Sequence, residues 1–333
     1  MLKDLAPKFF VVNDICGGTM GERTIWNFLL EGLPNSVAVD FRTTSSNRVR
    51  FELDARNYIH SQLNSSNGLG VIIQNASFIG KVSNEIPTIC LLQDNLREMY
   101  GRDYVQEYVL KTSESVVFNS QLVRESYPDI GGTVIPLGLD SVLFKIHNKA
   151  EMRIRHSIPS NSLVAVFVGA FNDVKGWQEV LQVCEHAMRD GIYLIAVTKE
   201  EGICAATFGF PGRIYQRIPQ DTLSELLGAA DFFILGSPVE TQCLAALEAG
   251  LCNVPILMKR TGIFMDMEQD VQDRIGVFDD DLGRGYEKLV KDRRLSGFQP
   301  RDSILAIGFS IMTMIELWRK EIDRVTSWPR LFY

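Results

Sequence analysis

The chain lacks the features that mark several common classes of protein. Its 333 residues include only four histidines, and none of its six cysteines forms a Cys-x-x-Cys pair. These absences exclude a zinc finger and a thioredoxin-like redox motif. No stretch approaches the roughly 20 apolar residues of a membrane-spanning helix. The net charge is −7 at pH 7, which argues against a nucleic-acid-binding role driven by contacts to phosphates.

The start of the chain also lacks the pattern of a secretory signal. The apolar run at residues 9–12 has only four residues, too few for the hydrophobic region of a signal peptide. Scattered cysteines of this kind suit reduced thiols in a cytosolic protein. We therefore expect a cytoplasmic location, with at most a peripheral membrane contact through the aromatic and basic tail at residues 327–333. Packing of that tail against the protein is the favoured alternative.

What the sequence does contain is typical of a soluble globular protein, with 46% hydrophobic and 23% charged residues. Short apolar strand patterns alternate with helix patterns from residue 8 to a long amphipathic helix expected at residues 303–324. This alternation predicts a doubly wound α/β fold. Ligands of such sheets bind beyond the carboxyl ends of the strands, so the candidate functional residues are the polar groups at those ends.

The most informative stretch is residues 235–256, which has the pattern strand, turn, helix, strand. Glu240 lies at the mouth of a helix expected at residues 241–251, and Glu248 follows eight positions later. That spacing corresponds to about 12 Å along a helix axis, so the two carboxylates can hold two ends of one elongated ligand. The ordinary alternative is that Glu240 complements the helix dipole and Glu248 is solvated. The apolar neighbours of Glu248 favour a functional role.

Other polar groups follow strands elsewhere in the chain. Gly17 and Gly18 lie between the first strand and a helix, where backbone N–H groups can cradle a phosphate. The pattern G-x-G-x-x-G is absent, so this is no dinucleotide fingerprint, and a plain tight turn is the alternative. Lys175 precedes a helix start and can face an anion; a solvated lysine is the alternative there. Further strands of the first half are followed by Gln93, Asp94 and Ser120.

Three segments of the chain resemble the retaining glycosyltransferases of the GT-B fold in family four. The segment SPVETQCLAALEAGLCNVPIL at residues 237–257 matches the carboxylate pair of that family, with seven residues between the two acids and a Val-Pro strand after them. IPLGLDSVLF at residues 135–144 matches the family pattern Ile-Pro-Asn-Gly-Val-Asp-x-x-x-Phe. Residues 169–176 match its Gly-Arg-x-x-x-x-Lys-Gly pattern, with Lys175 as the lysine.

The resemblance implies a role for each candidate residue. In the family the first glutamate contacts the donor sugar, the second holds the ribose hydroxyls and the lysine binds the diphosphate. These roles fall to Glu240, Glu248 and Lys175, with Glu240 and Lys175 as the catalytic pair. The other implied donor-binding residues are Gly17, Gly18, Tyr215, Thr241, Gln242 and Cys243. The implied acceptor-side residues are Gln93, Asp94 and Ser120.

The chain departs from the family pattern at three places. Thr241, Gln242 and Cys243 occupy the positions of the usual Gly-Phe-Gly. Gln93 stands where histidine is common, and Ala170 stands where arginine is common. These departures keep open a second hypothesis, namely a catalytically degenerate GT-B protein that acts as a partner or scaffold subunit.

The resemblance also implies an architecture and an activity. We expect two Rossmann-like, doubly wound domains facing a central cleft, at residues 1–146 and 147–312, with residues 313–333 returning as a helix and tail to the first domain. The implied reaction moves a sugar from a nucleotide-diphosphate-sugar to an acceptor hydroxyl with retention of anomeric configuration. The acceptor can be a glycan, a lipid, a protein or a small metabolite, and no nucleic acid is expected as a partner.

Neither a metal nor a further cofactor is expected, because no Asp-x-Asp pair lies at a strand end and residues 279–281 have the pattern of a solvated turn. A third hypothesis is a sugar-nucleotide epimerase on the same fold. Such enzymes use histidine in the cleft, whereas none of the four histidines here follows a strand.

Overall fold

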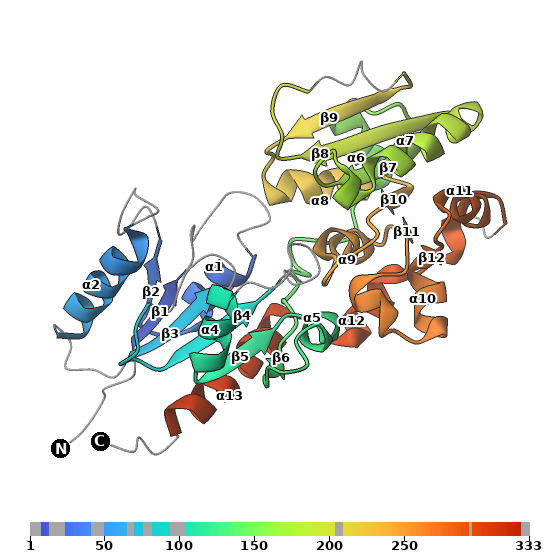
Figure 1. Cartoon of the computed structure of the whole chain (residues 1–333). Coiled ribbons are helices and arrows are strands. Elements are labelled where there is room, and N and C mark those ends of the chain that lie inside the picture. The colour runs from blue at the N-terminus through green and yellow to red at the C-terminus, as the bar shows by residue number, and fades with distance from the viewer. Residues whose placement is uncertain are drawn as a thin grey trace. The chain divides into compact units, whose positions relative to one another are not determined.

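The structure is a computed structural model that describes residues 8–12, 24–40, 50–64, 70–75, 82–93, 104–203, 209–292 and 295–327. The chain forms two compact units (Figure 1). Unit 1 consists of Met1–Gly138 together with Ile311–Tyr333, and unit 2 consists of Leu139–Ser310.

The described part of unit 1 contains a parallel six-stranded sheet in the order β2-β1-β3-β4-β5-β6. Its strands are β1 (Lys8–Val12), β2 (Ser36–Val39), β3 (Gly70–Asn75), β4 (Thr88–Leu92), β5 (Ser115–Phe118) and β6 (Thr133–Val134). Its helices are α1 (Thr24–Gly32), α2 (Phe51–Asn64), α4 (Tyr104–Thr112), α5 (Gln121–Glu125) and α13 (Ile311–Ser327). The central strands are fully buried, as β3 and β4 show along their whole length. Burial on both faces explains why their sequences are largely apolar and do not alternate between polar and apolar residues.

The described part of unit 2 repeats this plan with a parallel sheet in the order β12-β11-β10-β7-β8-β9. Its strands are β7 (Leu163–Val168), β8 (Ile192–Thr198), β9 (Gly212–Gln216), β10 (Phe232–Leu235), β11 (Ile256–Met258) and β12 (Gly276–Phe278). Its α-helices are α6 (Lys149–Arg155), α7 (Trp177–His186), α8 (Gln220–Ala229), α9 (Leu244–Leu251), α10 (Gln269–Ile275), α11 (Leu282–Tyr286) and α12 (Pro300–Ile307). Short 3-10 turns are η1 (Asp173–Lys175), η2 (Ala187–Asp190), η4 (Gly262–Met265) and η6 (Leu295–Gly297), and the π-helical η5 covers Glu287–Asp292. The predicted doubly wound α/β class is therefore confirmed in both units.

The end of the chain returns to unit 1, as expected. Helix α13 packs against α1, and its Trp318, Met314 and Ile315 are buried. Its Glu321 carboxylate accepts a hydrogen bond from the Ser115 hydroxyl at the start of β5. The apolar face of this helix is the reason for the return, since it has to be covered by another element.

The prediction of a single helix at residues 303–324 is wrong in one respect. The structure has two helices there, because Gly308 adopts a left-handed conformation (φ 82°) that ends α12. The segment after Gly308 pairs with the first residue of unit 2, where the Leu139 N–H donates to the Phe309 carbonyl at 2.8 Å.

The units divide at Gly138/Leu139 and at Ser310/Ile311, whereas the sequence placed the boundaries after residues 146 and 312. Leu139 and Phe144 are buried in the core of unit 2, so the segment that precedes α6 already belongs to that unit. Residues 328–333 of the expected tail lie outside the described residues.

In the part of the chain that the structure describes, none of the helices is long and apolar enough to cross a membrane.

Replacing Trp318 by alanine should destabilise unit 1. The side chain is fully buried on α13, and removing a buried tryptophan typically costs ~3–5 kcal/mol of unfolding free energy. Urea denaturation followed by circular dichroism measures the change. Met312→Ala on the same helix is the control: its side chain is 69% exposed, so the expected change is within about 0.5 kcal/mol. Equal effects of the two variants would contradict the packing of α13.

Candidate functional site

The sheet of unit 2 reverses its direction of growth between β7 and β10. From β7 the chain builds outward through β8 to β9, and β10 then adds on the other side of β7. The connections that follow β7 and β10 therefore lead toward opposite edges of the sheet. Doubly wound folds bind ligands at the carboxyl ends of such a pair of strands. Lys175 belongs to the loop after β7, and Glu240 belongs to the loop after β10.

The two residues predicted to be catalytic meet at this point. The Lys175 Nζ donates to Glu240 Oε1 at 2.6 Å, although the residues are 65 positions apart in sequence. The Glu240 side chain is 10% exposed and that of Lys175 is 33% exposed. The pair is partly shielded from water, which strengthens the attraction relative to a surface ion pair.

Two glycines allow this meeting. Gly176 has a left-handed conformation (φ 61°), and a Cβ atom added to it would collide with the backbone carbonyl of Gly236. A Cβ on Gly236 would in turn collide with the Gly176 carbonyl. The two loops therefore approach backbone to backbone, which only glycine permits at such distances.

Ser237, which was not a candidate from the sequence, also holds these two loops together. The fully buried Ser237 hydroxyl lies 2.7 Å from the Val174 carbonyl and 2.9 Å from the Val239 carbonyl. It links the segment that carries Glu240 to the residue beside Lys175. The only sequence signal was a small polar residue directly after an apolar strand and before a proline.

Glu248 lies on α9 and is buried, with 8% of its surface exposed. Burial raises the pKa of its carboxyl group to about 8, because the charged form loses hydration. The alternative of a solvated helix residue is therefore wrong. Helix α9 begins at Leu244 and not at residue 241, so the segment from Glu240 to Glu248 is only partly helical and the helical rise does not set their separation.

The residue before α9 has a backbone that is unusual for its type. Cys243 has φ 60° and ψ 57°, the left-handed conformation that glycine adopts readily and other residues resist. It stands where the resemblance expects the second glycine of Gly-Phe-Gly. Thr241 is half-buried and Gln242 is buried beside it. The chain thus changes the residue at this position and keeps a backbone that suits glycine.

Tyr215, expected near the nucleotide base, lies on β9. Its ring contacts the Arg213 guanidinium, with 5.2 Å between the guanidinium carbon and the ring centroid, and the edge of His156 at 6.4 Å between centroids. Burial raises the pKa of its hydroxyl. These contacts do not bring the Tyr215 ring to Lys175 or Glu240.

Of the candidates in unit 1, Gly17, Gly18 and Asp94 lie outside the described residues. Gln93 follows β4, its carbonyl accepts a hydrogen bond from Asn119 Nδ2 at 2.9 Å, and its own side-chain nitrogen is buried without a partner in the described structure. Ser120 follows β5, and its hydroxyl accepts from the Val123 N–H at 3.3 Å. Ser120 therefore caps α5.

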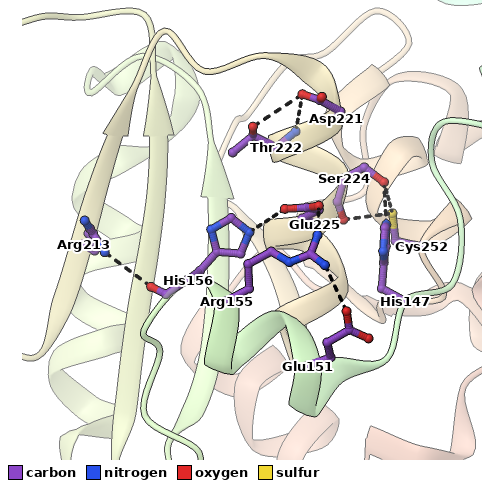
Figure 2. A network of polar contacts seen from close by, with 10 residues as sticks. All are labelled: His147, Glu151, Arg155, His156, Arg213, Asp221, Thr222, Ser224, Glu225 and Cys252. Carbon is purple, nitrogen blue, oxygen red and sulfur yellow. Dashed lines mark hydrogen bonds and ion pairs between the residues drawn. The ribbon is translucent and has the colours of Figure 1, made fainter.

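The histidines of unit 2 belong to networks on helices and connecting segments. Figure 2 shows His147 beside Ser224 and His156 beside Glu225, with 2.9 Å between the Nε2 atom and the partner oxygen in both pairs. His186 pairs with Glu287 at 2.8 Å. None of the three follows a strand, which agrees with a packing or surface role.

Replacing Gly176 by alanine should separate the two loops. Alanine would meet both the cost of a left-handed backbone and the Gly236 carbonyl, so the loss of unfolding free energy should be large. Gly191→Ala is the matched control: its φ is 74° and an added Cβ meets nothing within 4 Å, so only the backbone cost of about 1–2 kcal/mol is expected. Chemical denaturation of both variants tests the difference. Equal losses would contradict the close approach of the loops.

Comparison with known proteins gives matches at the level of sequence family and of fold. The family model of glycosyl transferases group 1 matches residues 148–296. A D-inositol 3-phosphate glycosyltransferase from Streptosporangium roseum is 23% identical over 202 residues, which are 54% of this chain and 46% of the relative. The enzyme of the same name from Stackebrandtia nassauensis is 25% identical over 263 residues, 71% of this chain and 57% of the relative. The chain thus spans about half the length of these curated relatives.

Two solved structures are similar over nearly the whole chain. Anabaena Alr3699/HepE in complex with UDP and glucose has a TM-score of 0.76 at 14% identity, with 96% of this chain and 100% of that chain covered. Sucrose-phosphate synthase from Thermosynechococcus elongatus has a TM-score of 0.74 at 14% identity, with 97% and 100% covered. The fold is shared at these identities. Residues 148–296, which contain Lys175, Glu240 and Glu248, match the family model of the group 1 glycosyl transferases, and the chain has the GT-B fold.

Proposed function

We propose that the protein transfers a sugar from a nucleotide-diphosphate-sugar to an acceptor hydroxyl with retention of anomeric configuration. The observation that carries the proposal is the Lys175–Glu240 pair at the point where the sheet of unit 2 reverses. A cation and a carboxylate held there by backbone contacts suit a ligand with an anionic part and a hydroxyl-bearing part. Unit 2 binds the donor in this proposal, and unit 1 binds the acceptor.

The Lys175–Glu240 ion pair gives the donor a defined task. In the free protein Lys175 neutralises Glu240. The donor diphosphate offers Lys175 a stronger anionic partner, and the released Glu240 carboxylate then accepts hydrogen bonds from the sugar hydroxyls. The buried Glu248 holds the ribose hydroxyls, and the N–H groups at the start of α9 face the sugar and its phosphate.

During transfer the bond between the anomeric carbon and the diphosphate oxygen breaks, and a bond to the acceptor oxygen forms on the same face. The leaving diphosphate takes the proton of the acceptor hydroxyl. Lys175 and the N-terminal end of α9 stabilise the charge that develops on the diphosphate. The proposal assigns no step to a metal ion or a further cofactor.

The first donor to test is UDP-glucose, because a structural neighbour, Alr3699/HepE, is described in complex with it. The curated relatives are described as acting on D-inositol 3-phosphate, so a polyol phosphate is a reasonable first acceptor. Glycans, lipids, proteins and other small metabolites follow as acceptor candidates.

The second hypothesis, a degenerate subunit without catalysis, rested on the missing Gly-Phe-Gly. The left-handed backbone of Cys243 weakens that argument, because this position keeps a conformation that suits glycine. The epimerase hypothesis has no support from the histidines, since those of unit 2 pair with residues on helices.

Glu240→Ala and Lys175→Ala should have different effects on nucleotide binding. Glu240→Ala removes the competing carboxylate, so UDP binding should be retained or tightened while sugar transfer is lost. Lys175→Ala removes the cation, and UDP binding should weaken by about tenfold or more, as loss of a charge-assisted hydrogen bond implies. Calorimetric titration with UDP and UDP release from UDP-glucose measure the two effects. Retained turnover in Glu240→Ala would remove this residue from the site, and failure of the unchanged protein to bind any nucleoside diphosphate would favour the non-catalytic hypothesis.

Donor affinity should depend on pH through Glu248. Its pKa is about 8 in the free protein, and ribose hydroxyls donate best to the ionised carboxylate. Affinity for UDP-glucose should therefore rise between pH 6 and 8, by up to about tenfold per unit. UDP-glucose is the suitable probe because its phosphodiester groups do not titrate in this range. Glu248→Gln is the control and should bind weakly with a flat profile.

The same proton fixes the direction of the stability change in the free protein. The unfolded chain releases it near pH 4.5 and the folded protein near pH 8, so the folded state binds more protons between these values and loses stability as the pH rises through them. Glu248→Gln should remove this loss in thermal melts. A wild-type profile of donor affinity that falls or stays flat from pH 6 to 8 would contradict the role of Glu248.

A further inference from the structure

The main chain of Glu240 is held by a third loop, the one that follows β11. The Glu240 N–H donates to the Thr261 hydroxyl at 2.9 Å. Thr261 is buried, with 3% of its surface exposed, so this hydrogen bond is protected from competition with water. The residues are 21 positions apart, and the contact joins the loops after two neighbouring strands, β10 and β11.

The hydroxyl of Thr261 has no part in its own local structure. Thr261 precedes the turn η4 in the position where a threonine side chain normally caps the following N–H groups, but its side chain makes no capping hydrogen bond there. Ser120, in the equivalent position before α5, does cap its helix. The Thr261 hydroxyl is thus directed to Glu240 in place of the usual capping contact.

The neighbouring glycine leaves room for Glu240. Gly262 has φ 59°, and an added Cβ atom would lie 3.1 Å from the Glu240 carbonyl oxygen and 3.2 Å from its Cβ. These separations are tighter than ordinary van der Waals contact. Thr261 therefore fixes the nitrogen end of Glu240, while Gly262 lets its carbonyl end settle against the loop.

We propose that Thr261, supported by Gly262, is a positioning residue that aims Glu240 at the transferred sugar. The inference rests on the proposed function. In the free protein Lys175 also restrains the Glu240 carboxylate. When the donor diphosphate occupies Lys175, that restraint is lost, and the hydrogen bond that the Glu240 N–H donates to Thr261 keeps the main chain in place. Thr261 acts through Glu240 and has no contact with the donor in this proposal.

Thr261→Val is the test, because valine keeps the shape and removes the hydroxyl. The partly buried Glu240 N–H then loses its acceptor, and the carboxylate shifts away from the sugar. We expect a turnover number about 10–100-fold lower, the size of effect that a small misplacement of a reacting group produces. The affinity for UDP should stay unchanged, because Lys175 and Glu248 hold that part. Thr261→Ser keeps the hydroxyl and should restore most of the turnover.

Three quantities are measured. The first is release of the nucleoside diphosphate from whichever of UDP-glucose, ADP-glucose and GDP-mannose the wild-type protein hydrolyses. The others are calorimetric binding of the same nucleoside diphosphate and the melting temperature. Thr88→Val is the matched control. Thr88 is a fully buried threonine in unit 1 whose hydroxyl donates to the Ile86 carbonyl at 3.1 Å. This variant should lower the melting temperature and leave turnover unchanged.

The outcomes separate the inference from the function beneath it. Wild-type protein that neither binds a nucleoside diphosphate nor hydrolyses any of the sugar nucleotides overturns the proposed function and the inference with it. Active wild-type protein with an equally active Thr261→Val variant overturns the inference alone. A Thr261→Val variant that loses diphosphate binding and turnover to the same extent shows a general structural role, which also overturns the inference.

Discussion

The close approach of two backbones at Gly176 and Gly236 is the constraint on which the candidate site depends. Strands β7 and β10 are neighbours in the sheet of unit 2, but the loops after them would separate if either glycine carried a side chain. Ser237 adds a buried hydroxyl link to the Val174 carbonyl. Once the loops are fixed in this way, Lys175 and Glu240 reach each other without further strain.

The charges of the site follow from this arrangement. Lys175 and Glu240 neutralise each other in the free protein, so neither is left as an unpaired charge in a partly buried place. Glu248 also avoids an unpaired buried charge, because burial raises the pKa of its carboxyl group and keeps it protonated at neutral pH. Both arrangements avoid an unpaired buried charge in the free protein. Both arrangements are reversible in the proposed reaction. A donor diphosphate can replace Glu240 as the partner of Lys175, and ribose hydroxyls can stabilise the Glu248 carboxylate.

Much of the fold could be predicted because buried parallel strands have apolar sequences that are easy to recognise. The largely apolar segments at residues 70–75, 115–118 and 163–168 form strands with those bounds. Helix ends were harder, because they depend on single residues. Gly308 splits a stretch whose apolar periodicity continues on both sides, and the left-handed Cys243 delays the start of α9.

The contacts that build the site were less accessible from the sequence. Lys175, Glu240 and Glu248 could be selected because they lie in motifs with a fixed spacing. Ser237 and Thr261 could not be assigned a role from the sequence. Each acts through a hydrogen bond to the loop that follows another strand, and the sequence does not show that these loops meet. A bond of that kind leaves no periodicity and no charge pattern at the donor or the acceptor. The backbone of Cys243 illustrates the same limit from the other side: the sequence has a cysteine there, whereas φ and ψ have values that glycine adopts readily. At such a position residue type alone is a poor guide to function, because the ligand would meet the direction of the N–H groups, and that direction is set by φ and ψ.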